Sequence, residues 1–278
     1  MRKAIMQELL AEYEAYMKEY EEAKAAKAAE IKAALEAGKY VFSEKPLCIN
    51  ENQLDAVLAA KDAENAKGAL SHVMIGFNRR FSPHAKLLKE YFSKRTLPLV
   101  MHYRVNAGSI PKDIWLQDSD IGGGRMVGEG CHFIDFMSYV CGAAVVKVQA
   151  MCIKTTNGAE TPEDSISVNL QFADGSVGTL EYVALGDTTL PKEFCEIHGE
   201  GSTATMDNFC KTVCTGKLGK RKLKGKQQKG FAEEIAATIA AVESGAAMPI
   251  PFEEILNVTK TTFAVLKAVK SGKSEIVD

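Results

Sequence analysis

A histidine flanked by two carboxylates is the group in this sequence best suited to proton transfer. His132 lies three residues after Glu129 and three residues before Asp135. Because residues three apart share a face of a helix, this spacing predicts a titratable ring beside a carboxylate. Residues 122–124 are three glycines, and glycine lets the backbone approach a ligand closely. A core helix with a hydrogen-bonded histidine is the alternative, and spacing alone leaves both open.

A lysine between a predicted strand and a proline is the second candidate for chemistry. Residues 40–42 are expected to form a short buried strand, and Glu44, Lys45 and Pro46 follow at its carboxyl end. Proline holds the preceding residue in extended or turn geometry, so the backbone at Lys45 is restricted. Ligands bind at the carboxyl ends of strands in open α/β sheets, and a lysine held there can transfer a proton.

Two arginines, Arg79 and Arg80, directly follow the next predicted strand, residues 72–77. The planar guanidinium can bind an anionic group of a substrate or cofactor. A surface ion pair is the alternative, and both interpretations stay open. With the helix predicted over residues 50–64, the two strands form a parallel crossover unit that is expected to be right-handed.

The bulk composition is that of a globular protein. The chain has 278 residues, of which 46% are hydrophobic and 25% are charged, enough for a large core in one or two domains. No apolar run approaches the roughly 20 residues that span a bilayer, and the first residues lack the apolar segment of a signal peptide. We therefore expect a cytoplasmic protein without membrane contact.

The net charge and the cysteines indicate which ligands and cross-links to expect. The net charge of -2 gives no reason to expect nucleic acid. The seven cysteines are scattered and include no Cys-x-x-Cys pair, so neither a metal site nor a disulfide framework is predicted. Reduced, mostly buried thiols are the simplest interpretation.

The pattern of the chain changes after Pro98. Before it, residues 5–37 show one long helical pattern rich in alanine, glutamate and lysine, which Gly38 ends. Beyond it, alternating runs predict strands, and an Asp-Gly turn predicts a hairpin. The fold class is therefore α/β (α+β), with a large open, mostly antiparallel sheet and helices on one face. Strands are predicted at 99–105, 145–153, 165–172, 178–183 and 194–198, and further helices at 83–93, 229–244 and 252–271.

Two segments resemble binding motifs but are predicted to be parts of the sheet. Residues 199–204 match the pattern G-x-G-x-x-A, which binds dinucleotides only where a helix follows the glycines. Here residues 204–206 continue as a strand, so we interpret the glycines as a hairpin turn. The segment 217–229 carries seven cations that could attract an anionic ligand. We favour a solvated hairpin edge, where lysines discourage strand pairing.

Several separated motifs resemble the glucose–fructose oxidoreductase / inositol dehydrogenase / rhizopine-catabolism family, known as Gfo/Idh/MocA. Residues 38–47 resemble its Glu-Lys-Pro segment, residues 76–81 its domain junction, and residues 122–135 its active-site helix. Residues 102–108 and 190–193 are further likenesses. The amino-acid sequence of these motifs is most similar to a subgroup of two-part proteins. In that subgroup, a half that resembles zinc alcohol dehydrogenases precedes such a unit. The resemblance covers about residues 28–278.

The resemblance implies an enzyme that moves a hydride between a sugar, cyclitol or nucleotide-sugar carbon and NAD or NADP. It also implies a second domain whose large open sheet often forms an oligomer interface, so a homo-oligomer is expected. A secondary alcohol is a weak acid, and a histidine near pH 7 can accept its proton. The implied site residues are Lys45 and His132 for catalysis, Arg79, Asn106, Glu129 and Asp135 for substrate, and Glu44, Lys45 and Pro46 for cofactor.

Two departures from the family pattern affect what the resemblance implies. Gly128 stands where many members carry an aspartate four residues before the histidine, and Glu129 faces about 100° around a regular helix. Only 44 residues precede Lys45 and no glycine occurs before Gly38, so we expect the pyrophosphate loop to be absent from this chain.

These departures define the expected domains and leave three hypotheses. We expect a helical extension over residues 1–30, a remnant of a Rossmann-type dinucleotide-binding domain over 31–80, and a substrate and oligomerisation domain over 81–278. The first hypothesis is a truncated oxidoreductase that is weak or inactive alone. The second is a non-catalytic sugar-binding or oligomerisation module. The third, a fragment or an engineered chain, is motivated by the Lys-Ala-Ala-Lys-Ala-Ala run at 24–29.

Overall fold

The structure is a computed structural model that describes residues 27, 29–65, 72–111, 122–153 and 164–278. Most of the helix predicted over residues 5–37 lies outside the described residues. Its last part is helical through residue 36, and Gly38 follows with a φ of 65°, as expected of a C-terminal cap. None of the described helices is long and apolar enough to cross a membrane.

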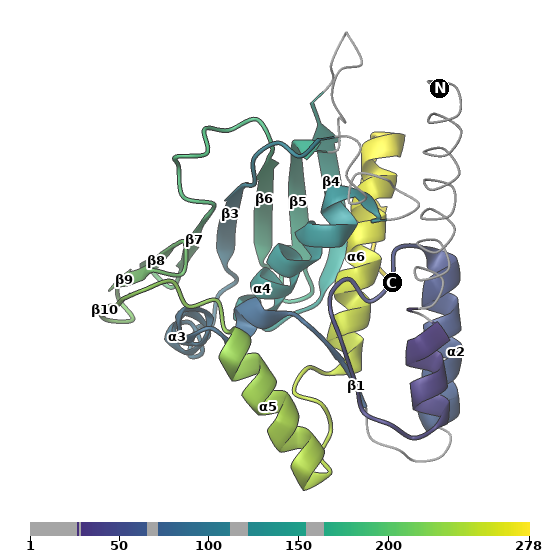
Figure 1. The fold of residues 1–278 in the computed structure, drawn as a ribbon. Helices are drawn as coiled ribbons and strands as arrows, with labels where there is room; N and C mark the ends of the chain where they lie inside the picture. Colours follow the sequence, from purple (N-terminus) through teal and green to yellow (C-terminus); the bar gives the residue numbers. More distant parts are fainter. Residues whose placement is uncertain (1–26, 28, 66–71, 112–121, 154–163) are drawn as a thin grey trace, which may run out of the picture.

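A nine-stranded sheet forms the main layer, in the order β10-β9-β8-β7-β3-β6-β5-β4-β11 (Figure 1). Only the pairing of β3 with β6 is parallel; the other pairings in this sheet are antiparallel. The predicted fold class is confirmed. The strands are β3 (Val100–Asn106), β4 (Val145–Cys152), β5 (Ile166–Phe172), β6 (Val177–Val183), β7 (Glu193–Gly199), β8 (Ser202–Asp207), β9 (Lys211–Gly216), β10 (Arg221–Lys224) and β11 (Glu275–Ile276).

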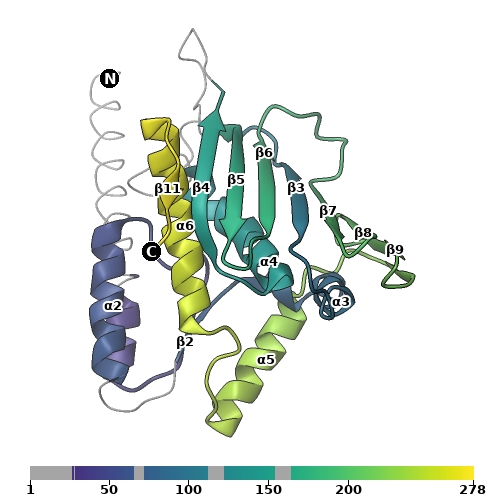
Figure 2. The ribbon, with the colours of Figure 1, turned by 180° about the vertical axis from the view of Figure 1, so that it is seen from behind.

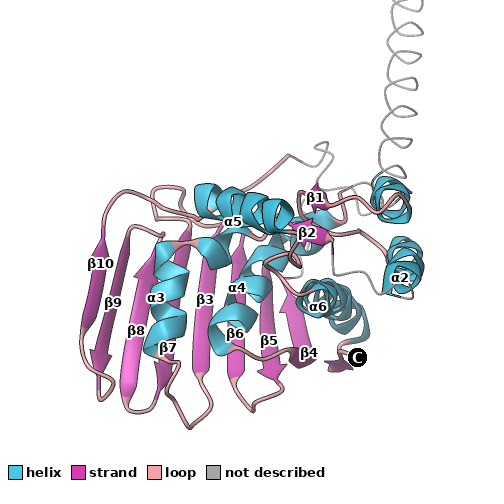
Figure 3. Ribbon diagram, turned by 90° about the horizontal axis from the view of Figure 1, so that it is seen from below, coloured by secondary structure: helices cyan, strands magenta, loops and turns pink. Residues whose placement is uncertain are grey.

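Helices cover one face of this sheet (Figure 3). They are α3 (Pro83–Tyr91), α4 (Cys131–Cys141), α5 (Phe231–Ser244) and α6 (Phe252–Ser271). The view from behind shows the strands in front of α4, and no described helix lies over their other face (Figure 2). Alternation along each strand causes this division, because every second side chain points to the helices. Tyr103 of β3 thus packs against Phe133 and Phe136 of α4, with ring centroids 5.2 Å apart in both pairs.

A small parallel pair of strands precedes the large sheet. β1 (Val41–Ser43) pairs with β2 (Val73–Ile75), and α2 (Glu51–Asn65) connects them. Asn50 begins that helix, since its Oδ1 accepts a hydrogen bond from the backbone N–H of Gln53 at 2.9 Å. The predicted parallel strand–helix–strand unit is confirmed. The expectation that its first strand is buried is wrong, because Phe42 is 37% exposed.

The hairpin turn predicted at residues 199–204 and the hairpin edge predicted within residues 217–229 are both confirmed. β7 and β8 pair in an antiparallel hairpin around Glu200 and Gly201, so no helix follows those glycines. β10 is the edge strand of the sheet, and Lys222 and Lys224 on it are exposed. Lys229 is the exception in the lysine-rich segment, because its ammonium turns inward.

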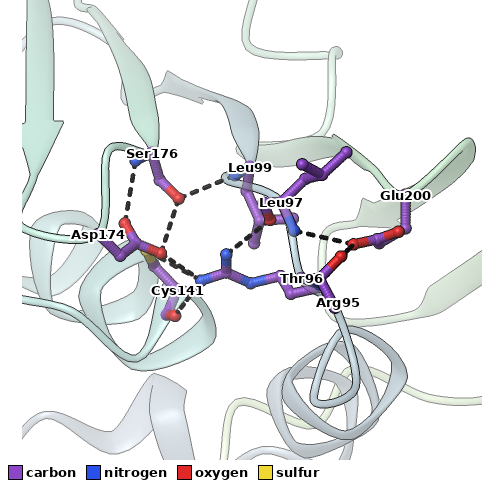
Figure 4. A network of polar contacts seen from close by, with 8 residues as sticks. All are labelled: Arg95, Thr96, Leu97, Leu99, Cys141, Asp174, Ser176 and Glu200. Carbon is purple, nitrogen blue, oxygen red and sulfur yellow. Dashed lines mark hydrogen bonds and ion pairs between the residues drawn. The ribbon is translucent and has the colours of Figure 1, made fainter.

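One arginine ties together turns that are distant in the sequence (Figure 4). Arg95 forms an ion pair with Asp174 in the β5–β6 turn, and its guanidinium donates to the carbonyl of Cys141 at 2.7 Å. Glu200, in the β7–β8 turn, accepts from the backbone N–H of Leu97 at 2.8 Å. These contacts fasten the end of α4 to two hairpins at the same end of the sheet.

Candidate active site

The helix that carries His132 begins with a π-helical turn. The turn, η3 (Met126–Gly130), runs directly into α4. Such a turn holds an extra residue and is frequent at functional sites. Gly123 leads into it with a φ of 74°, and a Cβ there would lie 3.0 Å from the side chain of Val127. The glycine run is therefore needed for the helix to begin this close to its neighbours.

This turn brings the two predicted catalytic residues together. The Nζ of Lys45 donates to the carbonyl of Gly128 at 2.7 Å, four residues before His132. The His132 ring is buried, with 7% exposure, and packs edge-on against Phe77 at a centroid distance of 6.2 Å. Its Nδ1 is buried without a hydrogen-bond partner. A buried polar atom without a partner is costly, so this nitrogen is available to a ligand.

The surroundings of His132 favour the neutral imidazole. Burial is the largest cause that holds its pKa well below the ordinary value. Four positive charges lower that pKa further, in the order Arg79, Lys45, Lys229 and Lys192. The ring is therefore neutral near neutral pH, because its charged form is disfavoured.

Glu129 does not pair with His132, which corrects the expectation of a carboxylate beside the ring. Its Oε1 accepts from the Nζ of Lys192 at 2.5 Å, and its Oε2 accepts from the Tyr182 hydroxyl. Burial raises the pKa of Glu129, but Lys192, the Tyr182 hydroxyl and Arg125 together outweigh that effect, so the pKa is lowered. The spacing rule fails because Glu129 lies in the π turn, where positions three apart no longer share the α-helical phase.

Asp135 is also bound elsewhere. Both its oxygens lie 3.1 Å from the Nε of Arg80, and the residue has no exposed surface. Arg80 also donates to Glu254 at 2.6 Å. Burial opposes the charge on Arg80, yet Asp135 and Glu254 raise its pKa, so it stays charged. This pair is a buried cross-link between η1 (Asn78–Phe81) and α4, and a role of Asp135 in substrate binding stays a prediction.

Arg79 forms a buried ion pair, not the surface pair that was the alternative to ligand binding. Its Nε and Nη2 donate to the two oxygens of Glu193, at 2.9 and 3.0 Å. Glu193 also accepts from Lys229 at 2.7 Å and from the Tyr103 hydroxyl at 2.7 Å. Burial would raise the pKa of Glu193, but Arg79 and then Lys229 lower it to about 2. Whether Arg79 also touches substrate stays a prediction.

Asn106 ends β3 with one free polar atom. Its Nδ2 donates to the carbonyl of Asp187 at 2.7 Å, while its Oδ1 is buried without a partner. A Cβ on Gly186 would lie 1.9 Å from that Oδ1, so glycine permits the close approach. Asn106 is thus a preformed acceptor, in keeping with the predicted substrate role that remains to be tested.

Arg125 is a site candidate that the sequence did not single out. It is 1% exposed, and its Nε donates to the Tyr182 hydroxyl at 2.7 Å. Its Nη2 donates to the carbonyl of Gly108 at 3.0 Å, while its Nη1 is buried without a partner. In the sequence, the only feature that could have identified Arg125 is its position directly after the three glycines.

The predicted cofactor residues lie at the carboxyl end of β1. The carbonyls of Glu44 and Pro46 accept from the Nζ of Lys27, at 2.5 Å for Pro46. The side chain of Glu44 lies against Gly76, where a Cβ would be 3.1 Å from its Oε2. Whether these residues contact a cofactor stays a prediction. The β1–α2 loop, residues 44–50, has no glycine for a pyrophosphate.

Comparisons with known proteins identify relatives of most of the chain. Residues 97–205 match the sequence model of the GFO/IDH/MocA C-terminal domain. The myo-inositol 2-dehydrogenase of Thermotoga maritima is 25% identical over 253 residues, which cover 87% of this chain and 74% of that protein. The uncharacterized oxidoreductase YrbE of Bacillus subtilis is 27% identical over 156 residues, 54% of this chain and 43% of YrbE. The match thus spans less than half of the length of YrbE.

Solved structures share the fold. An oxidoreductase domain protein from Kribbella flavida superposes with a TM-score of 0.77 at 20% identity, covering 92% of this chain and 78% of that one. Levoglucosan dehydrogenase in complex with NADH gives a TM-score of 0.73 at 20% identity, over 90% and 76% of the two chains. At these identities the likeness concerns the architecture alone.

Proposed function

Because the chain belongs to the Gfo/Idh/MocA family, we propose that its site oxidises or reduces a sugar-type hydroxyl with NAD or NADP. The observation that carries the proposal is the hydrogen bond from Lys45 to the Gly128 carbonyl, which places the ammonium beside the turn that leads to His132. The names of relatives support the substrate class, since they include inositol dehydrogenases and a levoglucosan dehydrogenase.

The proposed chemistry uses the neutral imidazole as the proton acceptor. The lowered pKa keeps His132 unprotonated near pH 7, so it can take the proton of the substrate hydroxyl. The Lys45 ammonium has donor capacity beyond its bond to Gly128 and would stabilise the oxygen as it loses that proton. A bound nicotinamide would supply the hydride acceptor, held by Glu44, Lys45 and Pro46.

The remaining predicted residues take different proposed roles. Asn106 would accept a hydrogen bond from a substrate hydroxyl through its partnerless Oδ1. Glu129 would position Lys192, to which it is bound. Arg79 and Asp135 would act by holding the walls of the site, since both are engaged in buried ion pairs. We also propose a homo-oligomer formed through the uncovered face of the sheet.

Turnover measurements test this proposal. We expect NAD- or NADP-dependent oxidation of at least one member of a panel of sugars, cyclitols and nucleotide sugars. His132→Ala and Lys45→Met should each lower the rate by about 10²–10⁴-fold, because each removes a group that handles the hydroxyl proton. His198→Asn is the matched control, since that histidine is exposed on β7.

The same measurements address the second hypothesis. Thermal melting of each variant would show that the fold is retained. Equal rates in the wild type and the His132→Ala variant would refute catalysis at this site and favour a non-catalytic sugar-binding module. One observation favours this alternative: the β1–α2 loop has no glycine that could bind a pyrophosphate.

A further inference from the structure

Among the residues that the structure describes, those around His132 include more cations than carboxylates. A sugar or a cyclitol does not by itself require charged partners, so the surplus needs a physical explanation. The cations that lie close enough to affect the ring are Arg79, Lys45, Lys229 and Lys192, and the carboxylates bound to them are Glu193 and Glu129.

The first surplus charge arises at Glu193. This single carboxylate accepts from Arg79 at 2.9 Å and from Lys229 at 2.7 Å. Its third partner, the Tyr103 hydroxyl, is uncharged. The group of three ionised side chains therefore keeps one positive charge, in a place where Glu193 has no exposed surface. Buried charges interact strongly because little solvent screens them.

The second surplus charge arises at Glu129. It binds Lys192 directly, and the charge of Arg125 also acts on it. No described carboxylate binds Arg125 directly, since its hydrogen bonds go to the Tyr182 hydroxyl and the Gly108 carbonyl. One carboxylate again serves two cations.

Lys45 supplies a third uncompensated charge. Its hydrogen bond goes to the carbonyl of Gly128, which is polar but uncharged. Lys27 lies close enough for the two ammonium groups to affect each other, and the carboxylate of Glu44 acts on Lys27 in the opposite direction. The carboxylates that bind Arg80 offset little of this surplus, because the second of them, Glu254, is 46% exposed and screened by solvent.

Lys192 is the cation best placed to meet a ligand. Its side chain is 37% exposed, whereas Arg79 is 6% and Lys229 is 18% exposed. Lys192 is anchored on Glu129, and Lys45 is anchored on the preceding residue, Gly128. The two ammonium groups therefore hold consecutive residues of the π turn that leads to the catalytic histidine.

We propose that the substrate is an anionic sugar, a uronic or aldonic acid, whose carboxylate binds the Lys192 ammonium while the reacting hydroxyl faces Lys45 and His132. The inference deepens the proposed function and rests on it for the identity of the site. An anion at this position offsets the surplus charge, and charge-assisted hydrogen bonds to a carboxylate are stronger than those to a hydroxyl. A neutral sugar leaves the surplus uncompensated.

Binding without cofactor tests this inference. Calorimetric titration compares D-glucuronate with D-glucose and D-gluconate with D-glucitol, pairs that differ in one carboxylate. We expect the wild type to bind the acid at least tenfold more tightly than its neutral counterpart in one of these pairs. Lys192→Met should abolish the preference, and Lys192→Arg should keep it because the charge is retained. Lys222→Met, on the exposed edge strand β10, is the control that should keep it too.

The outcomes separate this inference from the proposed function. Equal affinity for acid and neutral sugar, or no binding of either acid, overturns the anionic substrate, whatever the turnover assay gives. If the wild type prefers the acid over the neutral sugar and Lys192→Met does not, the anionic substrate is supported even where no hydride transfer is seen. Titration with NADH distinguishes the other source of negative charge. If Lys192→Met weakens NADH binding and leaves the acid preference intact, the surplus serves cofactor phosphates and the inference falls.

Discussion

At the scale of single residues, Glu234 in the first turn of α5 is a buried acid that the proposed chemistry does not use. It is 2% exposed, and its Oε1 has no hydrogen-bond partner. Burial raises its pKa to about 8, the charges of Glu44 and Asp135 raise it too, and Arg80 opposes them. The carboxyl group is therefore mostly protonated at neutral pH in the folded protein.

This raised pKa makes the contribution of Glu234 to stability depend on pH. The unfolded carboxyl loses its proton near pH 4.5, whereas the folded one keeps it to about pH 8. Stability from this group is therefore fully present below pH 4.5 and is lost as pH rises to about 8. Glu234→Gln removes that loss, so it should raise the free energy of unfolding at pH 9 by about 1–3 kcal/mol, with little change at pH 4.

Urea unfolding at both pH values measures the difference between variant and wild type. Glu243→Gln, at an exposed position of the same helix, is the control and should show no such pH dependence. A Glu234→Gln difference that stays constant from pH 4 to pH 9 would contradict a raised pKa.

At the scale of elements, α5 begins where its backbone meets that of η1. Gly230 has a φ of 88°, and a Cβ there would lie 2.3 Å from the carbonyl oxygen of Asn78 and 2.5 Å from the amide nitrogen of Ser82. Both close atoms belong to the backbone, so no side chain can move aside. α5 is therefore held against the segment that presents Arg79 and Arg80 to the site.

Gly230→Ala should lower the free energy of unfolding by about 2–5 kcal/mol, since left-handed strain and a backbone clash act together. Gly225→Ala is the matched control, because a Cβ there meets nothing within 4 Å. The control should change stability by no more than about 0.5 kcal/mol. Similar unfolding midpoints for both variants would show that α5 is free to move away from η1.

At the scale of the whole molecule, two surfaces could bring copies of the chain together. One is the uncovered face of the sheet (Figure 2). Asn169 of β5 is exposed and alternates with buried residues, so it lies on that face. The other is a stripe on α5 at helical spacing. Its members are Phe231 at 59% exposure, Ile235 at 44%, Ile239 at 50% and Val242 at 42%. We favour the sheet face, because most of its strands lie within residues 97–205, which match the GFO/IDH/MocA C-terminal domain, and α5 lies outside them.

Sedimentation velocity at micromolar concentration should show an oligomer that Asn169→Lys disrupts. In an interface related by a two-fold axis, one substitution places two like charges in the same contact. Ile239→Lys on the α5 stripe is the comparison and should leave the oligomer intact. A wild-type monomer would refute the proposed assembly, and the opposite response of the two variants would assign it to α5.

The sequence by itself determined many of the regular elements of this protein, although it did not predict β9 and β11. Alternation along residues 165–172 and 178–183, with Asp-Gly between them, predicted the β5–β6 hairpin that the structure contains. Asn50 predicted the start of α2, and the parallel β1–β2 unit followed from its spacing. These signals succeed because turns, caps and periodicity act over a few residues. The residues of the Glu-Lys-Pro segment and His132 were also identifiable as motifs.

Only the tertiary structure decided how the charges of the site are shared. Arg79 and Glu193 are 114 residues apart, and Lys45 and Gly128 are 83 apart, so no local pattern pairs them. A rule of 3.6 residues per turn likewise could not predict the π turn. Because of that turn, Glu129 does not share a helix face with His132. Burial explains why these contacts form. A charge that leaves water must be paired with another polar group, and only the folded chain brings that group close.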